Sequence, residues 1–133
     1  MLPASAADRD PANYDLYQQF ISDRSEYRVS ILSGRVVSAY VKNLLEDFAR
    51  DDLRPDWRYE RASVLSRAVV TAAREAAQRV GLDYAGVDVI QDRYTGRVYC
   101  LEANAAPGMS EDTVRSLYAH LQQALRGRAA RAS

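Results

Sequence analysis

The segment of residues 86–104, GVDVIQDRYTGRVYCLEAN, constrains the fold more than any other part of the sequence. Apolar residues on both sides of the tripeptide YTG predict two antiparallel strands and a short turn, with Gly96 in the left-handed conformation. The three-residue turn makes Asp88 a direct cross-strand neighbour of Glu102. Asn104 follows two residues later on the same face. The opposite face is expected to pack in the core through Val87, Val89, Leu101 and Ala103.

Carboxylates placed opposite each other repel, and partial burial of Asp88 and Glu102 increases the cost. A shared proton, a nearby arginine or a bound cation would each relieve this repulsion. Two carboxylates and the Asn104 amide oxygen form a set of hard-oxygen ligands, which is typical of magnesium sites. Spacing alone leaves a second interpretation open, a solvent-facing hairpin with unpaired acids and no ligand.

A second hairpin is predicted at residues 26–42, with Ser33 and Gly34 as its two-residue turn. In this register residue 26 faces 41, 28 faces 39 and 30 faces 37. Lys42 is then expected on the opposite face from Arg28. The core face is expected to hold Tyr27, Val29, Ile31, Val36 and Tyr40.

Two helices are predicted in the second half of the chain. The first spans residues 62–81 and ends at Gly81, and the second begins after the capping residue Ser110. Their buried stripes are expected at Leu65, Val69, Ala72, Ala76 and Val80, and at Val114, Leu117, Tyr118, Leu121 and Leu125.

The remaining segments complete the predicted domain. Residues 14–21 are expected to form a strand, and residues 43–61 a short helix followed by a loop. The order of elements predicts one α+β domain at residues 14–126, an antiparallel sheet packed with helices. A loose lead-in at residues 1–13 and a frayed basic tail at residues 127–133 flank this domain.

Composition excludes several classes of protein. The 133 residues include 18 Lys plus Arg and 18 Asp plus Glu, a balance that argues against nucleic-acid binding through bulk charge. One cysteine, Cys100, and one histidine, His120, exclude an internal disulfide and a metal site built from several Cys or His. Neither a signal peptide nor a membrane-spanning run is recognisable, so we expect a cytoplasmic protein without membrane contacts.

The sequences GLDYAGVDVI and GRVYCLEANAAPGMSEDT resemble the C-terminal end of ATP-grasp enzymes. The similarity is greatest to carboxylate–amine ligases, including D-alanine–D-alanine ligases and peptide-glutamate ligases. It implies an ATP-grasp C-terminal lobe in which an aspartate and an E-x-N pair hold magnesium against the phosphates of ATP. Those residues correspond here to Asp88, Glu102 and Asn104, with Mn²⁺ as an alternative metal.

The same resemblance implies further roles along the chain. The backbone of Gln19, Phe20 and Ile21 is expected to meet the adenine, and Glu26 the ribose hydroxyls. Arg28 is the candidate catalytic residue, positioned to stabilise an acyl phosphate, and Lys42 is a candidate phosphate contact. The loop of Gly108, Met109 and Ser110, which leads into a helix, is expected to hold the substrate.

The first nucleotide-binding lobe of ATP-grasp enzymes has no counterpart in this sequence. We therefore expect the C-terminal half of an ATP-dependent carboxylate–amine ligase, which proceeds through an acyl phosphate when complete and does not catalyse the reaction alone. Expected partners are a nucleotide and either the missing lobe in trans or further copies of the chain. Alternatives are a non-catalytic remnant, a nucleotide- or partner-binding module of the same fold, or a structural domain without a ligand.

Overall fold

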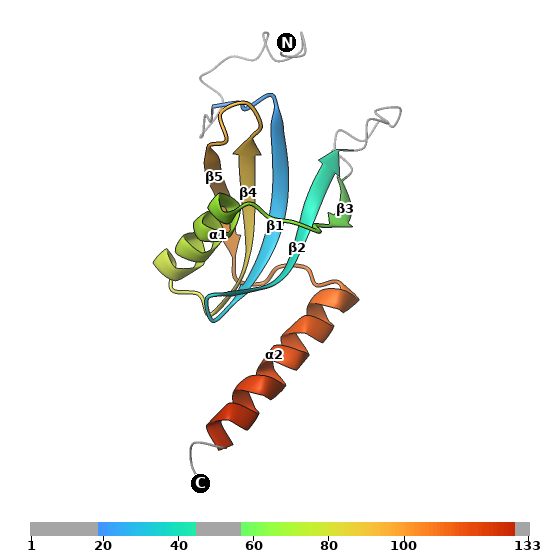
Figure 1. The fold of residues 1–133 in the computed structure, drawn as a ribbon, viewed down its shortest axis with the longest axis vertical. Helices are drawn as coiled ribbons and strands as arrows, with labels where there is room; N and C mark the ends of the chain where they lie inside the picture. The colour runs from blue at the N-terminus through green and yellow to red at the C-terminus, as the bar shows by residue number, and fades with distance from the viewer. Residues whose placement is uncertain (1–18, 45–56, 130–133) are drawn as a thin grey trace.

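A five-stranded antiparallel sheet with two helices forms the described part of the chain (Figure 1). The computed structural model describes residues 19–44 and 57–129. The strand order is β3-β2-β1-β4-β5, so the predicted α+β class is confirmed. The elements are β1 (Arg24–Leu32), β2 (Arg35–Leu44), β3 (Trp57–Arg61), α1 (Arg67–Arg79), β4 (Tyr84–Asp92), β5 (Val98–Asn104) and α2 (Glu111–Ala129).

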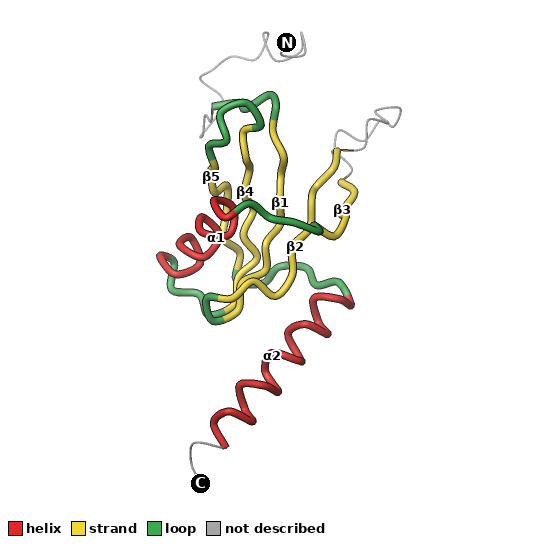
Figure 2. The backbone as a smooth tube through the Cα atoms, viewed as in Figure 1, coloured by secondary structure: helices red, strands yellow, loops and turns green. Residues whose placement is uncertain are grey.

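Helix α1 covers one face of the sheet (Figure 2). The helix begins at Arg67 and not at residue 62 as predicted, because the hydroxyl oxygen of its N-cap residue, Ser66, accepts a hydrogen bond from the backbone N–H of Val69 at 3.3 Å. It ends as predicted before Gly81, whose φ of 70° is the left-handed conformation that favours glycine. The core between helix and sheet consists of Val69, Ala73 and Ala77 from α1 and Val29, Ile31, Ala39, Ala85, Val87 and Val89 from the strands.

The predicted stripe on α1 is correct at Val69 but rotated at its other positions. Ala73 and Ala77 face the sheet directly, because alanine side chains are small enough to let the helix backbone approach the strands closely. Val80 was expected in the core and is 56% exposed, because it is the C-cap residue beyond the last helical turn. The remaining members of the predicted stripe, Leu65, Ala72 and Ala76, are partly buried at the edge of the core.

A β-bulge in the first hairpin shifts its register by one residue. The turn at Ser33 and Gly34 is confirmed, with φ values of 47° and 73° that suit a two-residue hairpin loop. Val37 is then the extra residue of β2, because Ile31 faces Val36 whereas Ser30 faces Ser38. The predicted pairings of 26 with 41, 28 with 39 and 30 with 37 are therefore wrong. Glu26 faces Lys42 and Arg28 faces Tyr40.

The bulge changes which side chains share a face of the sheet. Tyr40 was expected in the core and instead lies beside Arg28, on the face opposite α1. Ala39, which pairs with Val29, takes the core position that the uninterrupted register would have given to Ser38, and Val41 replaces Tyr40 opposite Tyr27. Lys42 moves to the same face as Arg28, so the predicted separation of these two cations is also wrong.

The second hairpin contains a compensating irregularity. Its loop is one residue longer than predicted, because the N–H of Asp92 donates to the carbonyl of Arg97 at 2.9 Å. Leu101 is the extra residue of β5, since Val89 faces Cys100 whereas Asp88 faces Glu102. The predicted pair of Asp88 and Glu102 is therefore confirmed. Leu101 was expected in the core but is 44% exposed, because the bulge turns it out of the regular alternation.

Two predicted segments differ from the structure. Residues 57–61 form the edge strand β3 where a loop was expected, and they pair with the last five residues of β2. Residues 19–21 form no strand, and the rest of the strand predicted at 14–21 lies outside the described residues. The helix predicted within 43–61 falls mainly on residues 45–56, which also lie outside the described part.

Helix α2 projects away from the sheet and contacts it mainly through β2 (Figure 1). The predicted cap is confirmed, because the Ser110 hydroxyl accepts a hydrogen bond from the N–H of Thr113 at 3.2 Å. The expected burial of the apolar stripe is wrong at every position except Leu117, which is partly buried, because α2 does not pack along the sheet. Helix α2 includes residues 127–129 of the predicted tail, and no helix in the described ranges is long and apolar enough to span a membrane. The exposed stripe residues are Val114, Tyr118, Leu121 and Leu125.

Candidate functional site

The face of the sheet opposite α1 carries rows of polar residues across neighbouring strands, and we call it the polar face. One row runs across β3, β2, β1, β4 and β5, as each residue pairs with the next. A second row places Lys42 beside Glu26, and a third places Ser38 beside Ser30. Strand pairing thus gathers residues that are far apart in the sequence. The first row is Arg61, Tyr40, Arg28, Asp88 and Glu102.

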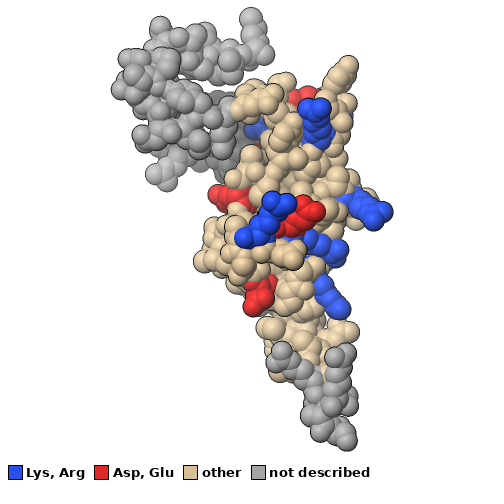
Figure 3. Space-filling view, turned by 90° about the vertical axis from the view of Figure 1, so that its left-hand side faces the viewer, with Lys and Arg blue, Asp and Glu red and all other residues tan. Residues whose placement is uncertain are grey.

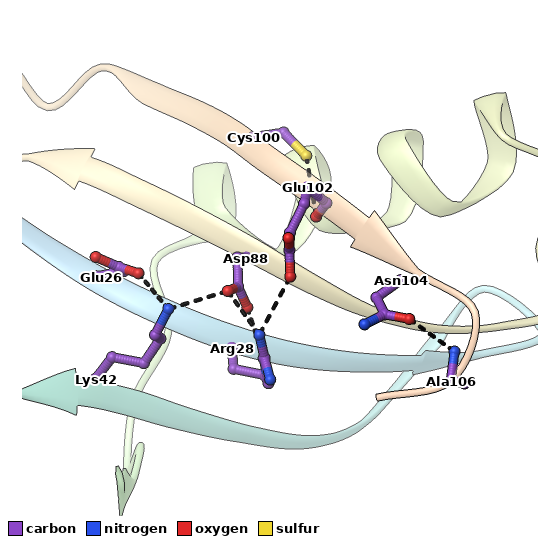
Figure 4. A network of polar contacts seen from close by, with 8 residues as sticks. All are labelled: Glu26, Arg28, Lys42, Asp88, Cys100, Glu102, Asn104 and Ala106. Atoms are coloured by element: carbon purple, nitrogen blue, oxygen red, sulfur yellow. Dashed lines mark hydrogen bonds and ion pairs between the residues drawn. The ribbon is translucent and has the colours of Figure 1, made fainter. Parts of the chain in front are cut away.

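Arg28 links the two carboxylates predicted to repel each other. Its Nε lies 2.6 Å from Oδ1 of Asp88, and its Nη2 lies 2.7 Å from Oδ2. The same Nη2 donates to Oε1 of Glu102 at 3.3 Å. Of the three expected ways to relieve the repulsion, the structure therefore shows the nearby arginine (Figure 4).

Lys42 is a second cation at the same aspartate. Its Nζ donates to Oδ2 of Asp88 at 3.0 Å and also to Oε1 of Glu26. The side chains of Lys42 and Asp88 are only 9% and 6% exposed. Charges this deep interact more strongly than surface pairs, because water screens them less. The ion pairs are connected from Glu26 through Lys42, Asp88 and Arg28 to Glu102, and we call these five residues the charge cluster.

Ionisation within the charge cluster follows these contacts. Burial alone would raise the pKa of Asp88, but hydrogen bonds from Arg28 and Lys42 outweigh burial, so the pKa is lowered. Burial would lower the pKa of Lys42, yet the hydrogen bonds to Glu26 and Asp88 raise it overall. The hydrogen bond to Asp88 likewise raises the pKa of Arg28. Asp88 is therefore an ionised carboxylate at neutral pH, the form that binds a metal or a cationic side chain.

Asn104, the third predicted metal ligand, lies apart from the two carboxylates. It faces Gly86 across β4, and its Oδ1 accepts a hydrogen bond from the backbone N–H of Ala106 at 2.8 Å. Figure 4 shows its side chain turned toward Ala106, while Asp88 and Glu102 point toward Arg28. The structure thus brings two of the three predicted ligands together and engages the third in the loop after β5.

The donor chemistry of the charge cluster suits a small, hard cation. Asp88 and Glu102 are carboxylates on adjacent strands, and both approach one guanidinium nitrogen closely enough to share a single positive centre. Within the described ranges, no three His, Cys, Asp or Glu residues are grouped closely enough to form a complete metal site. A metal here would take two protein carboxylates and complete its ligand set from other oxygen donors.

A cavity of about 320 Å³ lies next to Arg28 on the polar face. The predicted substrate loop forms part of its wall, and hydroxyl groups and one guanidinium supply its polar atoms. The guanidinium carbon of Arg28 lies 5.9 Å from the ring centre of Tyr59, close enough for a cation–π contact. The lining residues are Arg28, Ser30, Tyr40, Tyr59, Gly108, Met109, Ser110 and Thr113.

A chain of hydroxyl groups fixes the cavity wall to the sheet. Tyr40 and Ser110 share a short hydrogen bond, and Ser110 lies 3.0 Å from the hydroxyl of Thr113. Thr113 is buried and lies 3.0 Å from the hydroxyl of Ser38 on β2. The loop of residues 108–110 and the start of α2 are thereby held against β2.

The adenine-contacting segment proposed from the resemblance, Gln19 to Ile21, leads into β1. The carbonyl of Ile21 accepts a hydrogen bond from Nη1 of Arg24 at 2.7 Å, and the Phe20 ring lies 5.2 Å below the Arg24 guanidinium. Arg24 in turn lies 3.8 Å from Glu26, the residue expected at the ribose. This segment therefore adjoins the Glu26 end of the charge cluster.

Sequence reasoning missed several residues of this face, in particular Tyr40, Tyr59 and Thr113. Tyr40 was placed in the core because the register lacked the bulge, and Tyr59 because its strand was not recognised. The chain of hydroxyl groups could have been predicted in part from the three-residue spacing of Ser110 and Thr113. A serine that caps a helix lies next to the side chain three positions later. Charged residues elsewhere are mixed in sign on the side shown in Figure 3, as the balanced composition predicts.

The sheet, its polar face and the loop leading into α2 define an ATP-grasp type of domain, and comparison with known families agrees. The RimK-like ATP-grasp domain matches residues 6–122. The chain belongs to the RimK-like ATP-grasp family. No curated protein matches the sequence.

Solved structures of the ATP-grasp ligase PsnB share this fold. With PsnB bound to a phosphomimetic variant of its minimal precursor, Mg and ADP, the TM-score is 0.57 at 26% identity, covering 74% of this chain and 30% of PsnB. With PsnB bound to the minimal precursor alone, the TM-score is 0.54 at 26% identity, covering 69% and 29%. The chain thus spans less than a third of the length of these relatives.

Proposed function

We propose that this chain is the part of an ATP-dependent carboxylate–amine ligase that binds the phosphates of the nucleotide together with magnesium. The charge cluster carries the proposal, because it joins carboxylates for a metal to two cations suited to phosphate oxygens on one partly buried face. Family membership and the presence of Mg and ADP in a complex of the relative PsnB support it.

Each residue of the cluster has a proposed role. Asp88 and Glu102 hold the metal, and Asn104 joins them when the loop after β5 releases its side chain from Ala106. Magnesium supplies charge neutralisation at the phosphates. Glu26 holds the ribose hydroxyls next to the adenine-contacting segment of residues 19–21.

Arg28 and Lys42 are proposed to contact the transferred phosphoryl group. In the complete reaction the γ-phosphoryl group of ATP passes to a carboxylate, and an amine then displaces phosphate to form the C–N bond. Arg28 lies between Asp88 and the cavity, so its guanidinium can stabilise negative charge on the acyl phosphate. The loop of Gly108, Met109 and Ser110 forms the substrate side of that cavity.

The roles are proposed for a ligase larger than residues 1–133, since the chain spans less than a third of each PsnB structure. The first nucleotide-binding lobe, in trans or in a longer polypeptide, would complete the cleft. The same coverage favours a second candidate function, a nucleotide-binding module that does not itself turn over substrate.

Calorimetry with Mg²⁺ and ATP tests the nucleotide site. We expect heat of binding for the wild type and its loss in Asp88→Asn and Glu102→Gln. The matched control is Glu60→Gln, because the Glu60 side chain is 54% exposed, as Glu102 is at 55%, and lies outside the charge cluster. Absence of binding in the wild type, or equal binding in the Glu102 and Glu60 variants, would contradict the proposal.

A further inference from the structure

The oxygens of Asp88 that would bind a metal already accept hydrogen bonds from two side-chain cations. Arg28 takes both oxygens, at 2.6 and 2.7 Å, and Lys42 takes Oδ2 at 3.0 Å. Arg28 also donates to Glu102, the second carboxylate of the proposed metal pair. Because Oδ2 has two lone pairs and Arg28 and Lys42 use both, a metal ion bound to Oδ2 on the side shared with Glu102 requires at least one of these contacts to be given up.

Charge balance makes that exchange costly for a metal ion alone. Glu26, Asp88 and Glu102 are matched by Arg28 and Lys42 and by Arg24, which lies 3.8 Å from Glu26. A divalent cation entering by itself would displace Arg28 and Lys42 from their partners and leave an excess of positive charge at a poorly hydrated site. Uncompensated buried charge is strongly unfavourable. The displaced cations need a new anion.

The phosphates of a nucleotide would provide that anion. We propose that Arg28 and Lys42 occupy the place of the metal in the free protein and move to phosphate oxygens when the metal takes Asp88, so that metal and nucleotide each strengthen the binding of the other. This inference rests on the proposed function only for the identity of the anion. The exclusion of the metal by the two cations follows from their contacts with Asp88.

Two consequences are measurable. Thermodynamic reciprocity requires the nucleotide to tighten metal binding by the same factor by which the metal tightens nucleotide binding. Removing one of the two cations should make Asp88 more accessible to a metal ion, so a variant that lacks Lys42 should bind the metal ion without any nucleotide. The factor by which the nucleotide tightens metal binding should then be smaller, because only one cation remains to be displaced.

Titration of Mn²⁺, followed through the electron paramagnetic resonance signal of the free ion, tests this inference with and without ADP. For the wild type we expect weak binding of Mn²⁺ alone and at least ~10-fold tighter binding with ADP. For Lys42→Met and, separately, Arg28→Gln, we expect Mn²⁺ alone to bind ~10-fold more tightly than to the wild type. Arg58→Gln is the matched control, because it also removes one positive charge but pairs with Glu60, outside the cluster.

Thermal unfolding supplies a second readout for variants of reduced stability, since a bound ion raises the unfolding temperature of the folded form. We expect Mn²⁺ alone to raise it more for Lys42→Met than for the wild type. Equal Mn²⁺ affinity and equal temperature shifts in the wild type and both variants overturn the inference, even if Mg-ATP binds. Tighter Mn²⁺ binding in the variants without any effect of ADP supports the exclusion and instead overturns the proposed nucleotide site.

Discussion

Arg28 on β1 is the direct cross-strand neighbour of Asp88 on β4, and its guanidinium bonds to both oxygens of that carboxylate. A planar guanidinium matches a carboxylate in this paired geometry, which makes the interaction both directional and strong. Because Glu102 flanks Asp88 on the other side, one arginine orients two acids. The stability of the polar face and its capacity for ligands therefore depend on the same side chains.

Replacing Asp88 with asparagine should destabilise the fold. The change removes the negative charge that holds Arg28 and Lys42, and breaking a buried charge pair from one side costs roughly 3–5 kcal/mol. Urea unfolding measures this cost. Asp23→Asn is the control, because Asp23 is an exposed acid paired only loosely with Arg93, at 3.5 Å, and should change stability by less than about 0.5 kcal/mol. Equal losses of unfolding free energy in the two variants would show that the ion pairs of the charge cluster stabilise the fold no more than an exposed ion pair does.

The stability of the wild type should depend on pH through Asp88. Its pKa is lowered in the folded state, so its contribution is complete above about pH 4, the range of an unfolded aspartate, and is lost as pH falls through the folded value. The pKa of Lys42 is raised, so its contribution is complete below about pH 10 and is lost at higher pH. Denaturant unfolding of the wild type and Asp88→Asn should show a constant gap from pH 5 to 9 that narrows below about pH 4. A gap that widens on acidification would contradict this assignment.

Gly86→Ala should displace the substrate loop. A Cβ atom at Gly86 would lie 2.4 Å from Cβ of Pro107, which is closer than two carbon atoms can approach. We expect a loss of about 1–3 kcal/mol from this overpacking and altered amide signals in residues 108–110 by NMR. Gly127→Ala is the control, because no atom lies within 4 Å of a Cβ there and alanine favours the helix that contains it. An unchanged loop spectrum in Gly86→Ala would show that Pro107 does not depend on this contact.

Tyr40→Phe should loosen the attachment of the loop to the sheet. The variant keeps the ring that lines the cavity and removes the hydroxyl that bonds to Ser110, for an expected loss of about 1 kcal/mol. Thermal unfolding and hydrogen exchange at Thr113 measure the effect. Tyr94→Phe serves as control, since Tyr94 is 92% exposed in the β4–β5 turn. Faster exchange at Thr113 is expected only in the Tyr40 variant, and unchanged exchange would exclude a positioning role for this hydroxyl.

Local turn chemistry made part of the site predictable. Gly34 and Gly96 both adopt the positive φ expected of hairpin turns, and the opposition of Asp88 and Glu102 is confirmed. The longer loop of the second hairpin and the extra residue Leu101 offset each other, so the pair was correct although the register near the turn was wrong. The pattern of apolar and polar residues fits a three-residue loop with a regular β5 strand as well as it fits a four-residue loop with a bulge at Leu101. Both arrangements place Asp88 opposite Glu102.

The position of Lys42 was not predictable in this way. Val37 follows another valine, Val36, and either of the two could occupy the core face, so the sequence does not mark Val37 as the extra residue that moves Lys42 beside Glu26. The stripe on α2 was recognised as amphipathic, but amphipathicity does not reveal which surface covers it. The side chains of Tyr118 and Leu125 are exposed. The hydrogen bond between Thr113 and Ser38 fixes the start of α2 against β2, and from that point the helix leads away from the sheet (Figure 1).

The bulge at Val37 also determines which changes in the length of β2 this fold can accept. A gene that lost this one codon would join Val36 directly to Ser38, and regular alternation would then keep Lys42 on the polar face and Ala39 in the core. Both the substitution and the deletion of Val37 should therefore be tolerated among descendants of this chain. The faces on which the later residues of β2 lie do not depend on the extra residue, because regular alternation from Val36 produces the same faces.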